Sequence, residues 1–158
     1  MRLRIEQRGA KDTRWRDARL TQAVGHFART LRIPNPKELD IVLKMSGDKK
    51  LVNDGVVGMC CRHRNSIYTI IIQRDLPWTP TLEALAHEIV HVNQYATGRL
   101  QERRNMRSLI ESQWEGGAWM IDKVIPYALR PWEIEALSKE KELVASFFSV
   151  EKTVGNYY

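Results

Sequence analysis

The sequence predicts an α+β fold, with one small domain in which helices flank a short sheet. The chain has 158 residues and 43% of them are hydrophobic, which is enough for one ordinary core. Apolar residues recur at helical spacing near both ends of the chain, and three runs rich in β-forming residues lie between them. We therefore expect a single domain over residues 1–158, with its core in about 17–150.

The first predicted element is a helix over Asp17–Leu31. Its apolar side chains are spaced by three and four residues, as on one face of a helix: Leu20, Val24, Phe27, Ala28 and Leu31. Three strands are predicted next, over Leu39–Leu43, Gly55–Cys61 and Ser66–Ile72, because these runs are rich in β-formers and separated by polar or glycine-containing turns. We expect a mostly antiparallel sheet of three to four strands.

Two more helices are predicted in the second half of the chain. The first begins at Pro80, where Thr79 can cap it, and ends near Gly98. Between Leu109 and Met120 the pattern is mixed, and we expect only a strand or a hairpin there. The last helix is predicted from about Pro131 to Val150.

Composition narrows the classes of protein to consider. No run of about 18 uncharged apolar residues occurs, so we expect no membrane span, and the first residues lack the apolar run of a signal peptide. Cys60 and Cys61 are adjacent, which disfavours a disulfide, so a reducing cytoplasm is the expected compartment. The net charge of +6 can attract a nucleic acid, or it can belong to a solvated basic surface.

The segment from His87 to His91 carries the clearest chemical signal. Residues of a helix advance by about 100°, so His87 and His91 lie one turn apart on the same side and can reach one ion. The opposite side is apolar and suits a core: Leu82, Leu85, Ala86, Ile89 and Val92. Neutral imidazoles suit Zn²⁺, and a catalytic zinc site combines three protein ligands with water. Glu88 is the predicted general base for that water, although so short a pattern also arises by chance.

The third ligand is predicted at the start of the last helix. Glu133 falls between two apolar edges of that helix, whereas Glu135 points away from them. A lone carboxylate on an apolar face is costly unless it has a partner, and a metal ion is one. We therefore favour Glu133 over Glu135, while either residue can instead be an acid that interacts with the helix dipole.

These motifs resemble those of zincin metallopeptidases of the gluzincin type. Strands, then a helix with His87-Glu-x-x-His91, then Pro131-Trp-Glu-Ile-Glu-Ala136 opening another helix, are similar to the compact SprT-like and ImmA/IrrE-like metallopeptidases of phages and prophages. The resemblance spans Asp17–Val150 and implies a small zincin-like domain that cleaves a protein or peptide. It makes His87, His91 and a glutamate the zinc ligands and Glu88 the base, and its Glu-x-x-Ala pattern falls on Glu133. SprT-like proteins use a third histidine, and none follows His91 here.

The resemblance also points to residues around the site. In such enzymes the strand before the active-site helix, here Ser66–Gln73, is often an edge that pairs with an extended substrate; an internal strand is the alternative. Tyr127 is a candidate to stabilise the oxyanion of the tetrahedral intermediate, with packing as its alternative, and Tyr95 is a second candidate. His26 and His63 are predicted to be structural or exposed.

The sequence thus predicts a zinc-dependent hydrolase that cleaves peptide bonds. Two other classes stay open at this point. One is a basic, nucleic-acid-associated protein with a structural or vestigial zinc site, and the other is a phage-derived protein that binds a host partner without cleaving it. Manganese, iron and cobalt also accept histidine and carboxylate ligands.

Overall fold

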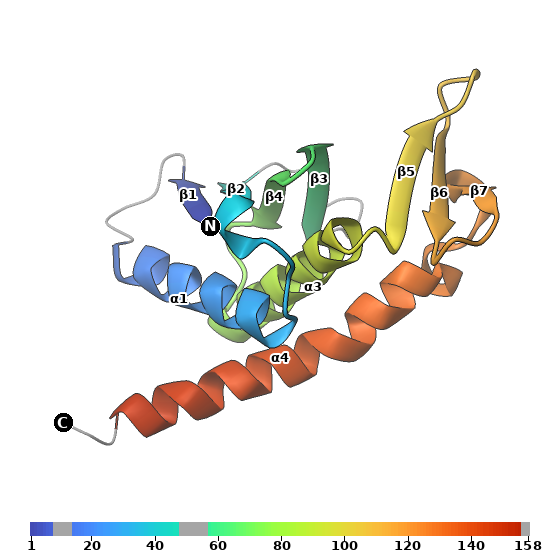
Figure 1. Cartoon of the computed structure of the whole chain (residues 1–158). Coiled ribbons are helices and arrows are strands. Elements are labelled where there is room, and N and C mark those ends of the chain that lie inside the picture. Colours follow the sequence, from blue (N-terminus) through green and yellow to red (C-terminus); the bar gives the residue numbers. More distant parts are fainter. Residues whose placement is uncertain (8–13, 48–56, 156–158) are drawn as a thin grey trace.

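The computed structural model describes residues 1–7, 14–47 and 57–155 (Figure 1). It has the predicted α+β class: helices cover a mixed four-stranded sheet, and a separate three-stranded sheet stands beside it. The predicted residues Gly55 and Val56 lie outside the described residues. None of the described helices is both long and apolar enough to cross a membrane.

The main sheet has the order β1-β2-β4-β3. Its strands are β1 (Arg2–Gln7), β2 (Asp40–Ser46), β3 (Gly58–Arg64) and β4 (Ile67–Gln73). The pairs β1–β2 and β2–β4 are parallel and only β3–β4 is antiparallel, so the expected mostly antiparallel pattern is wrong for this sheet. The reason is that the first residues form a strand, and helix α1 (Arg14–Thr30) provides the crossover that a parallel pair requires.

The position of β4 decides between the two alternatives for Ser66–Gln73, an edge strand or an internal strand. Strand β4 lies between β2 and β3, so Ser66–Gln73 is not an edge of the sheet. Among the described residues, the edge strand on that side is β3, which pairs only with β4. The sheet edge near the predicted active-site helix is therefore formed by β3, the neighbour of β4 in the sheet.

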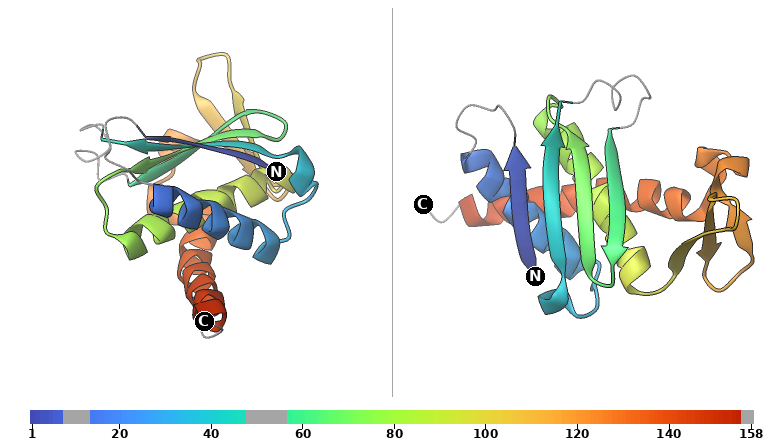
Figure 2. Two further views of the ribbon diagram at one scale, coloured as in Figure 1. Left: turned by 90° about the vertical axis from the view of Figure 1, so that its left-hand side faces the viewer. Right: turned by 90° about the horizontal axis from the view of Figure 1, so that it is seen from above.

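The core lies between the sheet and the helices. Helices α1 and α3 (Trp78–Ala96) lie side by side under one face of the sheet, and α4 (Pro131–Gly155) runs beneath them (Figure 2). The largest fully buried aliphatic side chains come from α1, from the two central strands, from α3 and from the residue Leu100 that follows it: Leu20, Ile41, Leu43, Ile70, Ile72, Leu82, Leu85, Ile89 and Leu100. Each contributes about 1.5–3 kcal/mol of transfer free energy when buried, so the packing of α3 is strongly fixed.

The ends of the helices differ in detail from the predictions. Helix α3 begins at Trp78 with Pro77 at its N-cap, so Thr79 lies inside the helix and does not cap it. The helix has no side-chain cap, and in its first turn the hydroxyl of Thr81 donates a hydrogen bond to the Pro77 carbonyl, at 2.8 Å. Gly98 follows the helix with a φ of 73°, a left-handed conformation that favours glycine and confirms the predicted stop.

The second sheet contains β5 (Leu100–Arg104), β6 (Ile110–Trp114) and β7 (Trp119–Ile121). The β6–β7 hairpin confirms the prediction for Leu109–Met120, whereas β5 was not predicted. The β5–β6 hairpin projects from the body of the molecule (Figure 1). Two short 3-10 helices, η2 (Asp122–Val124) and η3 (Tyr127–Leu129), then lead into α4.

Candidate metal centre

Helix α3 presents its two predicted histidines to helix α4. His87 and His91 are both buried, and their ring centroids lie 4.9 Å apart. The apolar side of the same helix is held in the core by Leu85, Ile89 and Val92, all fully buried. The packing of these side chains fixes the rotation of α3 about its axis. Because the histidines are spaced by one turn, both imidazoles then lie at the contact between α3 and α4.

Glu133 meets the histidines from the first turn of α4. Its Oε2 lies 3.0 Å from His87 Nε2 and 3.3 Å from His91 Nε2. The ligand atoms of these three residues all lie within 4.8 Å of one another, and all three side chains are buried. This group can hold a metal ion, and its two imidazoles and one carboxylate fit the donor set of zinc.

Glu135 is directed elsewhere. It accepts hydrogen bonds from Arg99 Nη1 at 3.0 Å and from Lys139 Nζ at 2.6 Å. Of the two glutamates that the sequence offered, the structure therefore brings Glu133, and not Glu135, to the histidines.

Two residues that the sequence analysis missed orient the imidazoles. His87 Nδ1 lies 2.9 Å from Glu140 Oε2, and His91 Nδ1 lies 2.8 Å from Gln94 Oε1. Carboxylate and amide oxygens only accept hydrogen bonds, so each Nδ1 donates, and each Nε2 is the atom aimed at Glu133. Gln94 Nε2 also donates to the Trp132 carbonyl at 2.9 Å, which ties α3 to the turn that carries Glu133.

Helical spacing contained a signal for both residues. Glu140 is seven residues beyond Glu133, and seven steps of about 100° return to within about 20° of the same side of the helix. Gln94 is three residues beyond His91 and lies on the same side of α3.

Electrostatics couple the three candidate ligands. Burial lowers the pKa of His87, but hydrogen bonds to Glu133 and Glu140 and the charge of Glu88 outweigh it and raise the pKa to about 9. Burial likewise opposes the charge of His91, yet Glu133 and Glu88 raise its pKa above the usual value. Burial also opposes ionisation of Glu133, and its hydrogen bonds to both histidines nevertheless hold its pKa far below the usual range. A metal ion bound between His87, His91 and Glu133 would therefore displace the protons that these three side chains share.

Glu88 lies beside the group without joining it. It is 5% exposed, and within the described ranges no group donates a hydrogen bond to its carboxylate. Burial raises its pKa to about 7, although the neighbouring histidines act in the opposite direction. Its side chain rests against β3, where a methyl group on Gly58 would lie 2.8 Å from Glu88 Oε1.

The two tyrosine candidates have different positions. The phenol oxygen of Tyr127 lies 3.3 Å from His87 Nε2, so this residue reaches the site. Burial raises the pKa of Tyr127 above its usual value, which keeps the phenol protonated and able to donate. Tyr95 instead donates to Glu102 Oε1 at 2.5 Å and is not part of the site.

The remaining histidines lie away from the site. His26 Nε2 is 2.8 Å from Ser146 Oγ, and His63 Nε2 is 2.8 Å from Thr69 Oγ1. Both have structural hydrogen bonds, as predicted. Cys60 and Cys61 are free thiols, as their adjacency indicated.

Comparison of the chain with models of known protein families, with curated proteins and with solved structures found no match.

Proposed function

We propose that this chain is a zinc-dependent metallopeptidase. The observation that supports the proposal is the convergence of His87, His91 and Glu133 on one point, with the buried Glu88 carboxylate beside them. A structural zinc site is usually closed by four protein ligands and needs no general base, whereas three ligands leave a position for water. Burying a further carboxylate with no hydrogen-bond donor is costly, and a role as general base accounts for it.

The chain's own residues provide the acid–base chemistry. Zinc, when bound, polarises the substrate carbonyl and acidifies a water molecule. Glu88 accepts the proton of that water as the water oxygen attacks the carbonyl carbon. Glu88 then gives the proton to the amide nitrogen as the carbon–nitrogen bond breaks. Tyr127 donates a hydrogen bond to the negative charge that develops on the carbonyl oxygen.

The sheet edge supports a peptide as the substrate. Strand β3 is an edge strand in the described part of the chain, and Gly58 at its start touches Glu88. An extended peptide that adds to this edge as a new strand brings its backbone to the general base. This proposal gives β3 the substrate-pairing role that was one of the two alternatives for Ser66–Gln73.

Metal content tests the ligand set. We expect about one zinc per chain in the wild type and in Glu135→Ala, and none in His87→Ala or Glu133→Ala, by elemental analysis of folded protein. Glu135→Ala is the matched control, because Glu135 is a neighbouring α4 carboxylate engaged by Arg99 and Lys139. Equal zinc in all four proteins would exclude this ligand set.

Cleavage of an unfolded protein such as casein tests the reaction. Glu88→Gln should retain zinc but lose about 10²–10⁴-fold in rate, the usual contribution of a general base. If Glu88→Gln cleaves at the rate of the wild type, Glu88 is not the general base. If the zinc-loaded wild type cleaves no unfolded protein, the peptidase proposal is excluded.

A further inference from the structure

The β5–β6 hairpin, residues 100–114, forms an arm that stands away from the body (Figure 1). Its tip is held by Asn105, whose side-chain oxygen accepts hydrogen bonds from the backbone N–H groups of Arg107 at 2.9 Å and Leu109 at 3.1 Å. The Asn105 amide also donates to Glu111 Oε1 at 3.3 Å. The tip is therefore an ordered turn with a fixed set of outward side chains.

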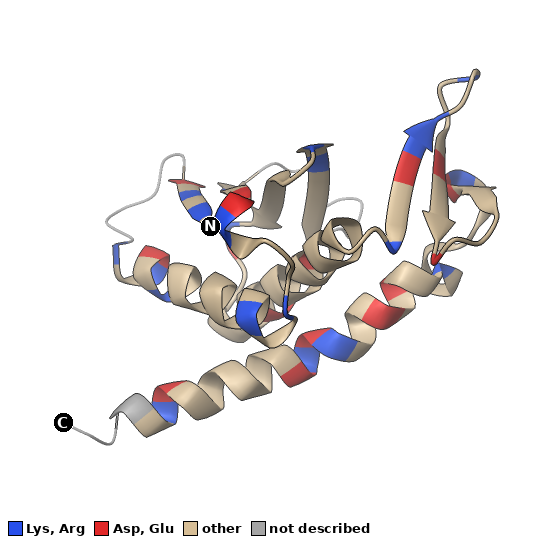
Figure 3. Ribbon diagram, viewed as in Figure 1, with Lys and Arg blue, Asp and Glu red and all other residues tan. Residues whose placement is uncertain are grey.

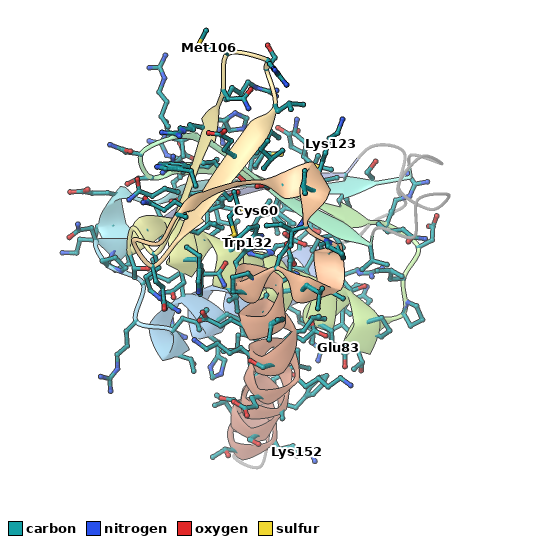
Figure 4. All side chains as sticks on the ribbon, turned by 90° about the vertical axis from the view of Figure 1, so that its right-hand side faces the viewer. Cys60, Glu83, Met106, Lys123, Trp132 and Lys152 are labelled. Atoms are coloured by element: carbon teal, nitrogen blue, oxygen red, sulfur yellow. The ribbon has the colours of Figure 1, made fainter. Side chains whose placement is uncertain are left out.

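That turn presents a methionine to solvent. The side chain of Met106 is fully exposed, at 105% of its reference area, and lies at the outermost point of the arm (Figure 4). Arg104 and Arg107 on either side of it are exposed as well. An apolar side chain in this position adds nothing to the core and is free to contact a partner.

Two more arginines, Arg62 and Arg64, lie at the end of the edge strand β3, and Arg62 is linked to the arm through Tyr95. The Arg62 guanidinium lies 5.3 Å from the centre of the Tyr95 ring, and the Tyr95 hydroxyl donates to Glu102 on β5. Arg104 is two residues beyond Glu102 and so lies on the same face of β5. Arg62, Arg64, Arg104 and Arg107 are defined here as the arginine patch, and Figure 3 shows basic residues at the end of β3, on β5 and at the tip.

The charges of this patch are not neutralised by neighbours. Within the described ranges, none of its four guanidinium groups forms an ion pair with a carboxylate. Nearby Arg99 and Arg103 differ, because they pair with Glu115 and Glu111, each at 2.8 Å. Guanidinium groups without acidic partners bind phosphate oxygens well, and the net charge of +6 acts in the same direction.

We infer that the arginine patch binds the phosphate backbone of duplex DNA and that Met106 enters a groove. An ordered β-ribbon tip that carries an apolar wedge between arginines suits a DNA groove. A single strand would need exposed rings for base stacking, yet Arg103 covers the Trp119 ring at 4.0 Å and Arg99 covers the Trp114 ring at 4.8 Å. The inference does not depend on the metal or on Glu88.

The test measures binding of a fluorescent 20-base-pair DNA duplex by anisotropy from about 50 to 200 mM salt. If the four arginines contact four phosphates, wild-type affinity falls by about 100-fold over this range, because counterions are released. Arg62→Gln/Arg64→Gln/Arg104→Gln/Arg107→Gln should lose most of this salt dependence. Met106→Ser should weaken binding without changing the salt dependence.

The matched control removes four exposed cations elsewhere, in Arg32→Gln/Lys37→Gln/Lys141→Gln/Lys152→Gln. It changes the net charge equally and should bind nearly as wild type does. The inference is overturned if the wild type does not bind duplex at the lowest salt, or if the control loses as much affinity as the patch variant. Equal or tighter binding of a single strand, or of vesicles with anionic lipid, would also overturn it. Glu88→Gln should bind as wild type, so this result and the peptidase result can fail separately.

Discussion

At the scale of single residues, Glu140 determines how His87 presents its Nε2 atom. The carboxylate accepts the Nδ1 hydrogen at 2.9 Å, which fixes both the tautomer and the ring orientation. We expect Glu140→Ala to weaken zinc affinity by about 10–100-fold, measured by competition with a chelating dye. Glu142→Ala, which removes an exposed glutamate from the same helix, is the control and should have no effect. Unchanged affinity in Glu140→Ala would exclude the orienting role.

Gly58 makes room for the Glu88 side chain. A methyl group there would lie 2.8 Å from Glu88 Oε1 and 3.2 Å from its Cγ, so one of the two must move. Gly58→Ala should therefore cost about 1–3 kcal/mol of unfolding free energy in urea, the usual range for overpacking. Most of this cost should vanish when Glu88 is already alanine. An equal cost in both backgrounds would show that Glu88 is not the residue displaced.

Local spacing explains which site residues could be predicted. His87, Glu88 and His91 lie within five consecutive residues of one helix, so the sequence alone places them together, and the apolar edges around Glu133 gave a reason to prefer Glu133 over Glu135. Contacts between residues of different helices could not be predicted in this way. Glu140 and Gln94 have the right helical spacing, but nothing local shows that α4 packs against the histidine side of α3.

At the scale of elements, helices were easier to predict than strand pairing. A period near 3.6 is a property of one segment, and it located α1, α3 and α4 within a few residues. Strand β1 also has a local signal, because the charged residues Arg2, Arg4 and Glu6 alternate with Leu3 and Ile5 as on the two faces of a strand. The parallel pairing of β1, β2 and β4 depends on where the chain crosses over, which local patterns do not encode.

Gln94 joins two elements through one side chain. Its oxygen accepts from His91 and its nitrogen donates to the Trp132 carbonyl, and both contacts are buried. Gln94→Leu keeps the approximate volume but leaves the His91 Nδ1 and Trp132 carbonyl groups unpaired. We expect a loss of about 1–3 kcal/mol in urea unfolding, together with weaker zinc binding. Asn93→Leu is the neighbouring control: Asn93 bonds to the Leu31 carbonyl, so its substitution should leave zinc binding unchanged.

At the scale of the whole molecule, the site couples stability to pH. The folded pKa of His87 is about 9 against an ordinary value of 6.5, so its stabilising effect is complete below 6.5 and is lost as pH rises through 9. The folded pKa of Glu88 is about 7 against 4.5, so its effect is also lost as pH rises, between 4.5 and 7. The pKa of Glu133 is lowered in the folded state, so its contribution to stability has the opposite pH dependence and is lost only as pH falls below 4.5.

These signs predict opposite pH trends with and without metal. With a chelator present, the melting temperature should fall between pH 5 and 9, because His87 and Glu88 both lose stabilising protons in that window. The increase in melting temperature caused by added zinc should instead grow with pH, because the metal competes with protons for His87, His91 and Glu133. Calorimetry at several pH values measures both trends. His87→Ala shares all other charges with the wild type, so the pH dependence of the difference between them belongs to this site. A zinc effect that does not grow with pH, or that is the same in His87→Ala, would mean that zinc binds elsewhere.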